Sequence, residues 1–597
     1  MADLPVHNPQ AVLGDEGEQS ANDEAELLRA LQFYKSEAEQ ARSGGENPRD
    51  VIWDANWDRY WGRYDHSDKM AWQSKHVMPE VPQFVDRWAA AMREALDAGG
   101  DWFTAVDETG ESNDLTPHIN RLMTIILGRC GVTPDGHRVE FSSVFEDQMK
   151  QGAITACCAA VTWKNDEQGG WPAVDTVDPR EVWRDPKGRN LYRVRRYEVD
   201  HHELLALAEL EDEDGQPIYN RAKIAELAAS HDADLRRNRE SSSGSGQGSE
   251  APGRSSIVID EWVATVLAPD GSVMAAKALI VVANENFLIR GPEPNPFWHK
   301  QDWIVLTPMI SVPGSIYGRS YMEDWSDMAD AFVEMTNLIL DSTYISALRG
   351  FAAQPDALKD PRQLTEGFTP NVIYLLEEGI SPRDFMKEVD TGTLPAEAVR
   401  VWTALKQELR EGAKLSEIAL GQLPPNAHHT ATAVSEVSQS ASAMIRSMAR
   451  TIEVRLLEPV LTMLWQNALQ HMDFQDLAPE IGQETADMLT IRREEFAERR
   501  IRFRVRGISG LIDRQAKLRN MMSMLQTVGQ IEPLLQALFS QTTPETMLRM
   551  MFRLFGIDPQ ELKPSERERM EQQVREQQQM AQAQQAQGGP GPQGAGQ

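Results

Sequence analysis

The stretch that decides the fold begins RSYMEDWSDMADAFVEMTNLILDSTYISALRG, residues 319–350, and extends to His471. It contains two helical segments around an irregular insert, then a proline-rich loop and one long helix. In the first segment, apolar side chains occupy two positions of a seven-residue repeat, which predicts a helix that packs against a neighbouring helix. The seam residues are Trp325, Met328, Phe332, Met335 and Ile339.

Carboxylates lie on a different face of this first helix and form an acidic stripe made of Asp327, Asp330, Glu334 and Asp341. A second helix is predicted from Pro395 to Leu420, because apolar residues recur at helical spacing and proline suits a first turn. Prolines and glycines interrupt the insert between the two helices, where residues 372–376 are expected to form a short strand.

The loop at residues 421–429 follows the second helix, and the adjacent Pro424 and Pro425 exclude helical structure there. A third helix is predicted to begin at Thr430 or Thr432. Its apolar spacing continues for about forty residues, or about 60 Å at 1.5 Å per residue, and we expect Pro459 to kink it.

This order of elements resembles the central part of the portal proteins of tailed bacteriophages, the head-to-tail connectors, and most of all those of short-tailed phages. The resemblance covers roughly residues 70–560. Short strings agree with it at residues 177–186, 313–320, 430–450 and 453–459. It implies an α+β, mainly helical portal fold that assembles as a ring.

The resemblance also implies how the chain divides. The expected parts are a partly disordered N-terminal arm (1–49), a mixed α/β wing (50–318) with a flexible Ser/Gly loop (239–256), a first stem helix (319–350), a clip (351–394), a second stem helix (395–420), a tunnel loop (421–429), a long kinked wing helix (430–475), a basic strand with a helical crown (476–565) and a disordered tail (566–597). The tunnel loop holds Leu423, Pro424, Pro425, Asn426, Ala427, His428 and His429.

The function implied is that of a channel at one capsid vertex, through which double-stranded DNA is packaged and ejected. The expected partners are further copies of the chain in a ring of about twelve (a homododecamer), a terminase, head-tail adaptor or tail proteins, a major capsid or scaffolding protein, and the DNA. The protein would assemble in the host cytoplasm and reside in the virion. The alternatives are another ring-forming head-tail adaptor or tail component, and an enzyme with an unrecognised active site.

The composition suits a channel through which DNA passes better than a protein that binds DNA tightly. The 597 residues carry 60 Lys and Arg against 91 Asp and Glu, a formal charge of −31. Tight binding of phosphates depends mainly on Lys and Arg, so such a chain is not expected to grip DNA over its whole surface. An acidic lining suits a passage through which a polyanion slides.

One local basic feature stands out at residues 500–506, where arginine alternates with Ile501, Phe503 and Val505. The alternation predicts a strand with one apolar face and one face of guanidinium groups, from Arg500, Arg502, Arg504 and Arg506. Two interpretations stay open. Nearby glutamates (494, 495 and 498) or carboxylates of a neighbouring subunit neutralise the arginines, or the arginines contact packaged DNA.

Three tryptophans, Trp53, Trp57 and Trp61, recur every four residues and therefore share one helical face. They are expected to form a packing stripe, and the alternative is an anchor onto a neighbouring subunit. Helices are also predicted at residues 22–42, 84–96 and 115–130, a strand at 139–141, and mainly extended chain over 161–199.

The three cysteines predict no disulfide framework. Cys157 and Cys158 lie in an apolar run and are expected to be core thiols. No signal peptide or membrane-spanning stretch is expected.

Enzyme signatures come close and fail, so we expect no catalytic residues, no metal site and no cofactor. The glycines of residues 314–320 are too closely spaced for a phosphate loop, and Arg319 stands where lysine is required. Residues 212–215 imitate the start of a calcium loop, but Arg221 stands where the closing glutamate belongs. The two histidine pairs, at residues 201–202 and 428–429, lack the further ligands that a metal site requires.

Overall fold

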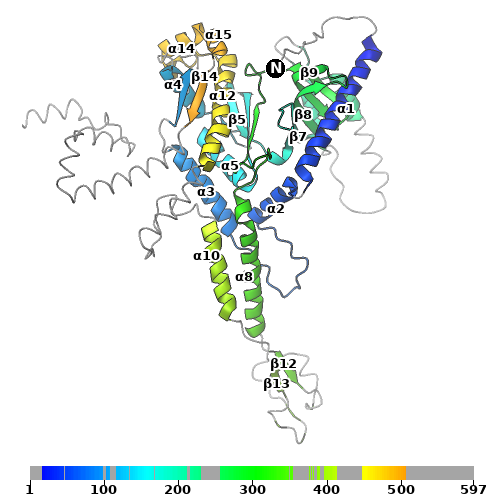
Figure 1. Ribbon diagram of the computed structural model, residues 1–597, viewed down its shortest axis with the longest axis vertical. Helices are drawn as coiled ribbons and strands as arrows, with labels where there is room; N and C mark the ends of the chain where they lie inside the picture. Colours follow the sequence, from blue (N-terminus) through cyan, green and yellow to red (C-terminus); the bar gives the residue numbers. More distant parts are fainter. Residues whose placement is uncertain are drawn as a thin grey trace, which may run out of the picture. The chain divides into compact units, whose positions relative to one another are not determined.

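The structure is a computed structural model of the chain (Figure 1). It describes residues 16–45, 47–97, 102–107, 116–133, 135–166, 169–211, 216–229, 256–347, 350–353, 386–389, 396–412, 447–499 and 501–505, with a few single residues between 359 and 381. The chain divides into two units, and nearly all of the described residues belong to the unit made of Met1–Glu94 and Phe103–Val505. The account below concerns this unit.

The first sheet has five antiparallel strands in the order β10-β9-β8-β7-β6. The strands are β6 (Val182–Arg184), β7 (Tyr192–Asp200), β8 (Ser256–Leu267), β9 (Val273–Ala283) and β10 (Phe287–Pro294). Helix α1 (Glu16–Ser43) runs along one face of this sheet (Figure 1). It contains the helix predicted at residues 22–42 and begins earlier.

Both faces of this sheet are buried, because alternate side chains of each strand point to opposite sides. On one face, Trp262 and Ile280 pack with α1, whose Tyr34 stacks on Tyr192 at 4.7 Å between ring centroids. On the other face, residues such as Ile259 and Val281 share a core with helix α6 (His201–Ala208), with residues 221–229 and with the second sheet. These two cores hold the sheet in the middle of a layered body.

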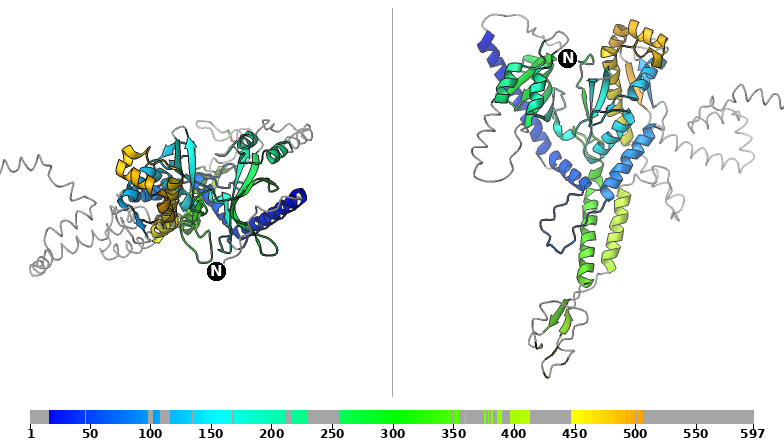
Figure 2. Two further views of the ribbon diagram at one scale, coloured as in Figure 1. Left: turned by 90° about the horizontal axis from the view of Figure 1, so that it is seen from above. Right: turned by 180° about the vertical axis from the view of Figure 1, so that it is seen from behind.

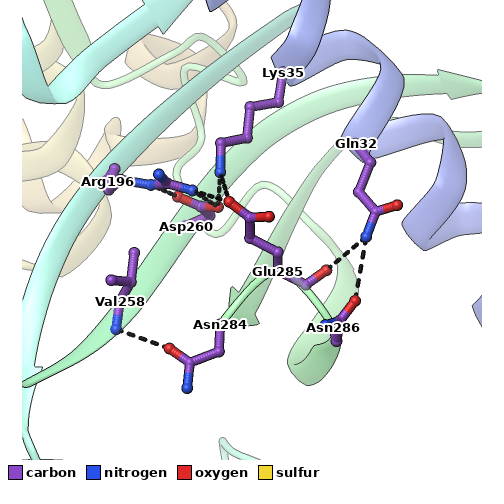
Figure 3. A network of polar contacts seen from close by, with 8 residues as sticks. All are labelled: Gln32, Lys35, Arg196, Val258, Asp260, Asn284, Glu285 and Asn286. Atoms are coloured by element: carbon purple, nitrogen blue, oxygen red, sulfur yellow. Dashed lines mark hydrogen bonds and ion pairs between the residues drawn. The ribbon is translucent and has the colours of Figure 1, made fainter.

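A charged network ties α1 to the sheet (Figure 3). Lys35 donates to Asp260 at 3.1 Å and also contacts Glu285. Arg196 donates to both oxygens of Asp260, at 2.8 and 3.0 Å, and to Glu285 at 2.7 Å. Burial raises the pKa of Asp260, and the hydrogen bond and charge of Arg196 oppose that shift. Two cations thus balance two carboxylates at a site where an unpaired charge would be costly.

The second sheet has the order β11-β4-β5-β2-β3. Its strands are β2 (Gly131–Val132), β3 (Arg138–Val139), β4 (Cys157–Asp166), β5 (Gly169–Thr176) and β11 (Ile304–Thr307). Helices α5 (Phe141–Ile154) and α12 (Glu458–His471) both pack against β4 and β5. As predicted, Cys157 and Cys158 are fully buried in the core, and both are free thiols.

The prediction of a strand at residues 139–141 is wrong at the C-terminal end of that strand. The extended chain stops at Val139, and Phe141 begins α5. The reason is packing, because Phe141 and Phe145 are one helical turn apart, lie 6.2 Å apart between ring centroids, and are both buried. A β-prone residue is therefore recruited into a helix by its contact with the core.

The long third helix is described only from residue 447. It runs through residues 447–452, passes through a π-helical turn at Glu453–Leu457, and continues as α12, with Pro459 in the first turn. Proline has no N–H group, so the carbonyl of Arg455, four residues earlier, cannot receive a helical hydrogen bond from it. The π turn therefore coincides with the position where Pro459 was expected to disturb the helix.

The remaining elements surround these layers or extend from them. The helices are α2 (Arg49–Trp61), α3 (Glu80–Asp97), α4 (Thr116–Leu127), α8 (Ser326–Ala347), α10 (Ala396–Gly412), α13 (Ala478–Ile481), α14 (Gln483–Ile491) and α15 (Arg493–Glu498). The strands form two pairs, β1 (Phe103–Asp107) with β14 (Ile501–Val505) and β12 (Gly350–Ala353) with β13 (Met386–Val389). Helices α3 and α4 agree with the predictions at residues 84–96 and 115–130.

Candidate functional site

Helices α8 and α10 lie side by side in Figure 1 and in the right view of Figure 2, and they are in contact. Phe332 of α8 stacks on Trp402 of α10, with 5.6 Å between ring centroids, and the indole N–H of Trp402 donates to the hydroxyl of Thr336 at 2.9 Å. Of the predicted seam, Trp325 and Phe332 are buried, whereas Met328, Met335 and Ile339 are half-buried.

The four carboxylates of the acidic stripe have two different environments. Asp327 and Glu334 are exposed. Asp330 accepts three hydrogen bonds from Arg59, at 2.8–3.0 Å, and the buried Asp341 accepts from the backbone N–H of Ser74 at 2.5 Å. Half of the stripe therefore holds α2 and the chain that follows it against α8.

Asn337 completes this attachment. Its side-chain oxygen accepts from the backbone N–H of His76 at 2.8 Å, and its Nδ2 donates to the carbonyl of His76 at 3.0 Å. The amide thus binds the backbone of residue 76 as a neighbouring strand would. No local pattern in the sequence indicates these contacts, because the partners are more than 250 residues apart.

Apolar side chains are exposed on two opposite faces of α8. Leu338 (54% exposed) and Ile345 (36%) are seven residues apart and share one face. Leu340 (41%) and Tyr344 (51%) share another, and Leu340 is two residues from Leu338, or about 200° around the helix.

Helix α10 repeats this arrangement with Val399 (45% exposed) and Val401 (48%), also two residues apart. The helix pair thus leaves apolar surface uncovered on more than one side within a single chain.

The arginine strand is β14, which pairs antiparallel with β1. Ile501, Phe503 and Val505 are buried and Arg502 and Arg504 are exposed, so the predicted alternation is confirmed over the described positions. Arg500 and Arg506 lie outside the described residues.

The carboxylate that meets this strand comes from α12. Arg502 lies 3.3 Å from Glu458, which is only 7% exposed, whereas Arg504 makes no ion pair with a described residue. Of the glutamates expected to neutralise the strand, Glu495 bonds Arg492 and Arg499 instead. Those hydrogen bonds lower the pKa of Glu495 to about 2.

The three tryptophans of α2 differ in environment. Trp53 is fully buried and meets Tyr317 edge-on at 5.7 Å, as a packing residue does. Trp57 is half-buried and stacks on Trp61, whose surface is 61% exposed. Packing within the chain thus accounts for Trp53, and the question of a neighbouring subunit stays open for Trp57 and Trp61.

Several predicted features lie outside the described residues. They are the tunnel loop from Leu423 to His429, the start of the long helix, most of 351–394, the Ser/Gly loop, the helices after Arg506 and the tail. Among the residues that the structure does describe, no group of three or more His, Cys, Asp or Glu side chains is placed to hold a metal ion. None of the described helices has the length and apolar character needed to cross a bilayer.

Comparison with known families identifies the chain. The family described as "Phage SU10 portal protein" matches residues 132–588, well over half of the sequence. The match includes both sheets from Val132 onward, the α8–α10 pair, the π turn and the arginine strand. No curated protein matches the chain. The chain therefore belongs to the phage SU10 portal protein family and is a portal protein of a tailed phage.

Proposed function

We propose that this chain is the repeating subunit of a ring that forms the DNA channel at one vertex of the capsid. Double-stranded DNA passes through the ring during packaging and ejection, and the ring is the docking platform for a terminase and for head-tail adaptor or tail proteins. Membership of a structural, non-enzymatic family supports this role. In this proposal α8 and α10 are the stem helices, residues 351–394 the clip, and residues 421–429 the tunnel loop.

The observation that carries the ring is the pair of apolar faces on α8. In a closed ring each subunit uses one surface toward the preceding copy and a different surface toward the next. Helix α8 offers two such surfaces. One is formed by Leu338 and Ile345, and the other by Leu340 and Tyr344. Covering them with neighbouring copies stabilises the assembly by about 25 cal/mol for each Å² of apolar surface buried.

The charge of the chain suits a channel. A net charge of −31 discourages tight phosphate contacts, and Asp327 and Glu334 keep carboxylates exposed on α8. In the proposed ring these carboxylates act on DNA by repulsion, so the duplex slides.

The assembly proposal is tested by charge substitution on each face. Leu338→Glu and Tyr344→Glu place a carboxylate on opposite sides of α8, and each is expected to reduce the ring fraction at least about tenfold, because a buried unpaired charge is costly. Ile491→Glu is the matched control, since Ile491 is 82% exposed on α14. Sedimentation velocity reports the ring fraction, and circular dichroism checks the fold. Rings that persist in both α8 variants would contradict the proposal.

The tunnel loop is tested separately by deleting residues 423–428. Rings should form, because the deletion spares α8 and α10, while the DNA packaged or retained per capsid should fall. Unchanged packaging and retention would remove the proposed role of the loop without affecting the ring.

A further inference from the structure

A cavity of about 410 Å³ lies among β7, β11 and the π turn. Its size is within the range of small-ligand pockets. Cations outnumber carboxylates in its lining, although the chain as a whole is acidic. They are Arg184, Arg193, Lys277, Lys300 and Arg455, against a single carboxylate, Asp302.

The one carboxylate is already engaged. Asp302 accepts from Nε of Arg193 at 2.9 Å and lies 3.3 Å from Nη2 of Arg184. Arg193 is 1% exposed and also bonds Glu261 at 2.9 Å. Burial lowers the pKa of Arg193, but Asp302 and Glu261 outweigh that effect and raise it, so this guanidinium stays charged. The inner wall is therefore a fixed element in which two guanidinium groups are balanced by two carboxylates.

The outer wall holds three cations that have no partner in the part of the chain that the structure describes. Lys277, Lys300 and Arg455 are exposed, and their side chains make no ion pair or hydrogen bond with any residue that the structure describes. Lys277 (φ 47°) and Lys300 (φ 50°) both adopt the left-handed backbone conformation, which is uncommon for lysine. Backbone conformations of this kind cluster at binding sites.

The π turn is what brings Arg455 to this cavity. Pro459 and Thr307 are also lining residues, and the hydroxyl of Thr307 donates to the Arg455 carbonyl at 2.9 Å. The bond fixes the backbone of residue 455 at the edge of the pocket. The same proline that interrupts the long helix thus positions a cation.

We propose that this cavity is a phosphate-binding site. Arginine and lysine are the side chains that bind phosphate best, the guanidinium as a planar fork and the ammonium as a point charge. A duplex cannot enter a cavity of this volume, which accommodates one or two phosphate groups. The phosphate comes from a free polyphosphate or nucleotide, or from a backbone phosphate of DNA that reaches the mouth. Binding within a single chain needs no ring, so the site can be tested apart from the proposed assembly.

The test is isothermal titration calorimetry on the purified full chain, with sodium pyrophosphate in one arm and a short DNA duplex in the other. The variant carries Lys300→Gln and Arg455→Gln. The control carries Arg63→Gln and Lys75→Gln, which removes the same charge from exposed residues outside the cavity. Thermal melting confirms that both proteins are folded.

We expect pyrophosphate to bind at one site per chain, with an affinity at least about tenfold weaker in the cavity variant than in the control protein. Binding should also weaken between about 50 and 200 mM salt. If only the duplex shows this difference, DNA is the source of the phosphate. Equal binding by variant and control in both arms would overturn the proposal. So would a cavity variant that loses only self-association, since the cavity would then accept an acidic segment of a second copy.

Discussion

Thr307 donates its hydroxyl hydrogen to the backbone carbonyl of Arg455 at 2.9 Å. In a regular α-helix this carbonyl would accept from the backbone N–H of residue 459. That residue is Pro459, which has no N–H group. Thr307 is 1% exposed and ends β11, so a strand of the second sheet supplies the donor that the helix lacks. The π turn and the sheet are therefore coupled through one side chain.

This coupling predicts a non-additive pair of substitutions. Thr307→Val leaves a carbonyl without a partner and should lower the free energy of unfolding by about 1–2 kcal/mol. In a Pro459→Ala background the helix regains an N–H donor, so the cost of Thr307→Val should fall by at least about half. Chemical denaturation of the four proteins measures this. Equal costs in the two backgrounds would show that the hydroxyl does not replace the missing donor.

A pH dependence should arise from His299, which is 8% exposed and accepts from the backbone N–H of Gln301 at 3.0 Å. Burial lowers its pKa to about 4, with Asp302 opposing the shift. Between pH 6.5 and 4 the unfolded chain binds a proton that the folded chain does not. Stability should therefore be lost as the pH falls through this window, by up to about 3 kcal/mol, and be independent of His299 above pH 6.5.

Melting curves from pH 7.5 to 4.5 check this effect. His299→Gln should lose less stability on acidification than the unsubstituted chain, because glutamine does not titrate. His137→Gln is the control, since that side chain is 80% exposed. Identical pH profiles for the chain and for His299→Gln would refute the assignment.

The network around Asp260 predicts a large effect from one lysine. Among the described residues, Lys35→Met leaves Asp260 and Glu285 with Arg196 as their only cation, and it should destabilise the fold by about 3 kcal/mol. Adding Asp260→Asn should recover part of that loss. Gln32→Met removes exposed hydrogen bonds from the same helix and should cost under about 1 kcal/mol. A Lys35→Met cost no larger than that of Gln32→Met would contradict this account.

The two described arginines of β14 should behave differently. Arg502 pairs with the largely buried Glu458, so Arg502→Gln should lower the melting temperature. Arg504 has no ion-pair partner among the described residues, so Arg504→Gln should leave stability unchanged and, if the strand contacts DNA, lower the DNA packaged per capsid. If capsids with Arg504→Gln package the normal amount of DNA, the exposed face of β14 has no role in DNA binding.

The thiols should be inert in the folded chain. Burial raises the pKa of Cys158 to about 12 and raises that of Cys130 and Cys157 further. An aromatic disulfide reagent at pH 8 should therefore detect three thiols per chain only after unfolding. Rapid labelling of the native protein would show that one of these cores opens easily.

Periodic patterns predicted those parts of the fold in which one face is buried. The alternation at 501–505 identified the buried side of β14, and the seven-residue repeat from Trp325 to Ile339 identified the helix α8. The helix begins at Ser326 and not at Arg319, because residues 322–324 form a 3-10 turn before it. In both cases the period of the backbone determines which side chains meet the core, so local sequence is sufficient.

Contacts between segments that are distant in the sequence could not be predicted from periodic patterns. Asp330 and Asp341 have the same pattern as the exposed Asp327 and Glu334, and only the fold reveals that Arg59 and Ser74 bind them. Phe141 favours a strand by type but begins a helix because of its packing. The cavity draws its residues from positions 184 to 463, and no motif joins them.

The central claim is that this chain functions as a ring, and native mass spectrometry of the purified protein tests it most directly. For a chain of 67.0 kDa, the account predicts one closed assembly, of about 800 kDa for a ring of about twelve. It also predicts that annular particles are visible by negative-stain microscopy. A mass that stays at one or two chains under every condition, without annular particles, would contradict it.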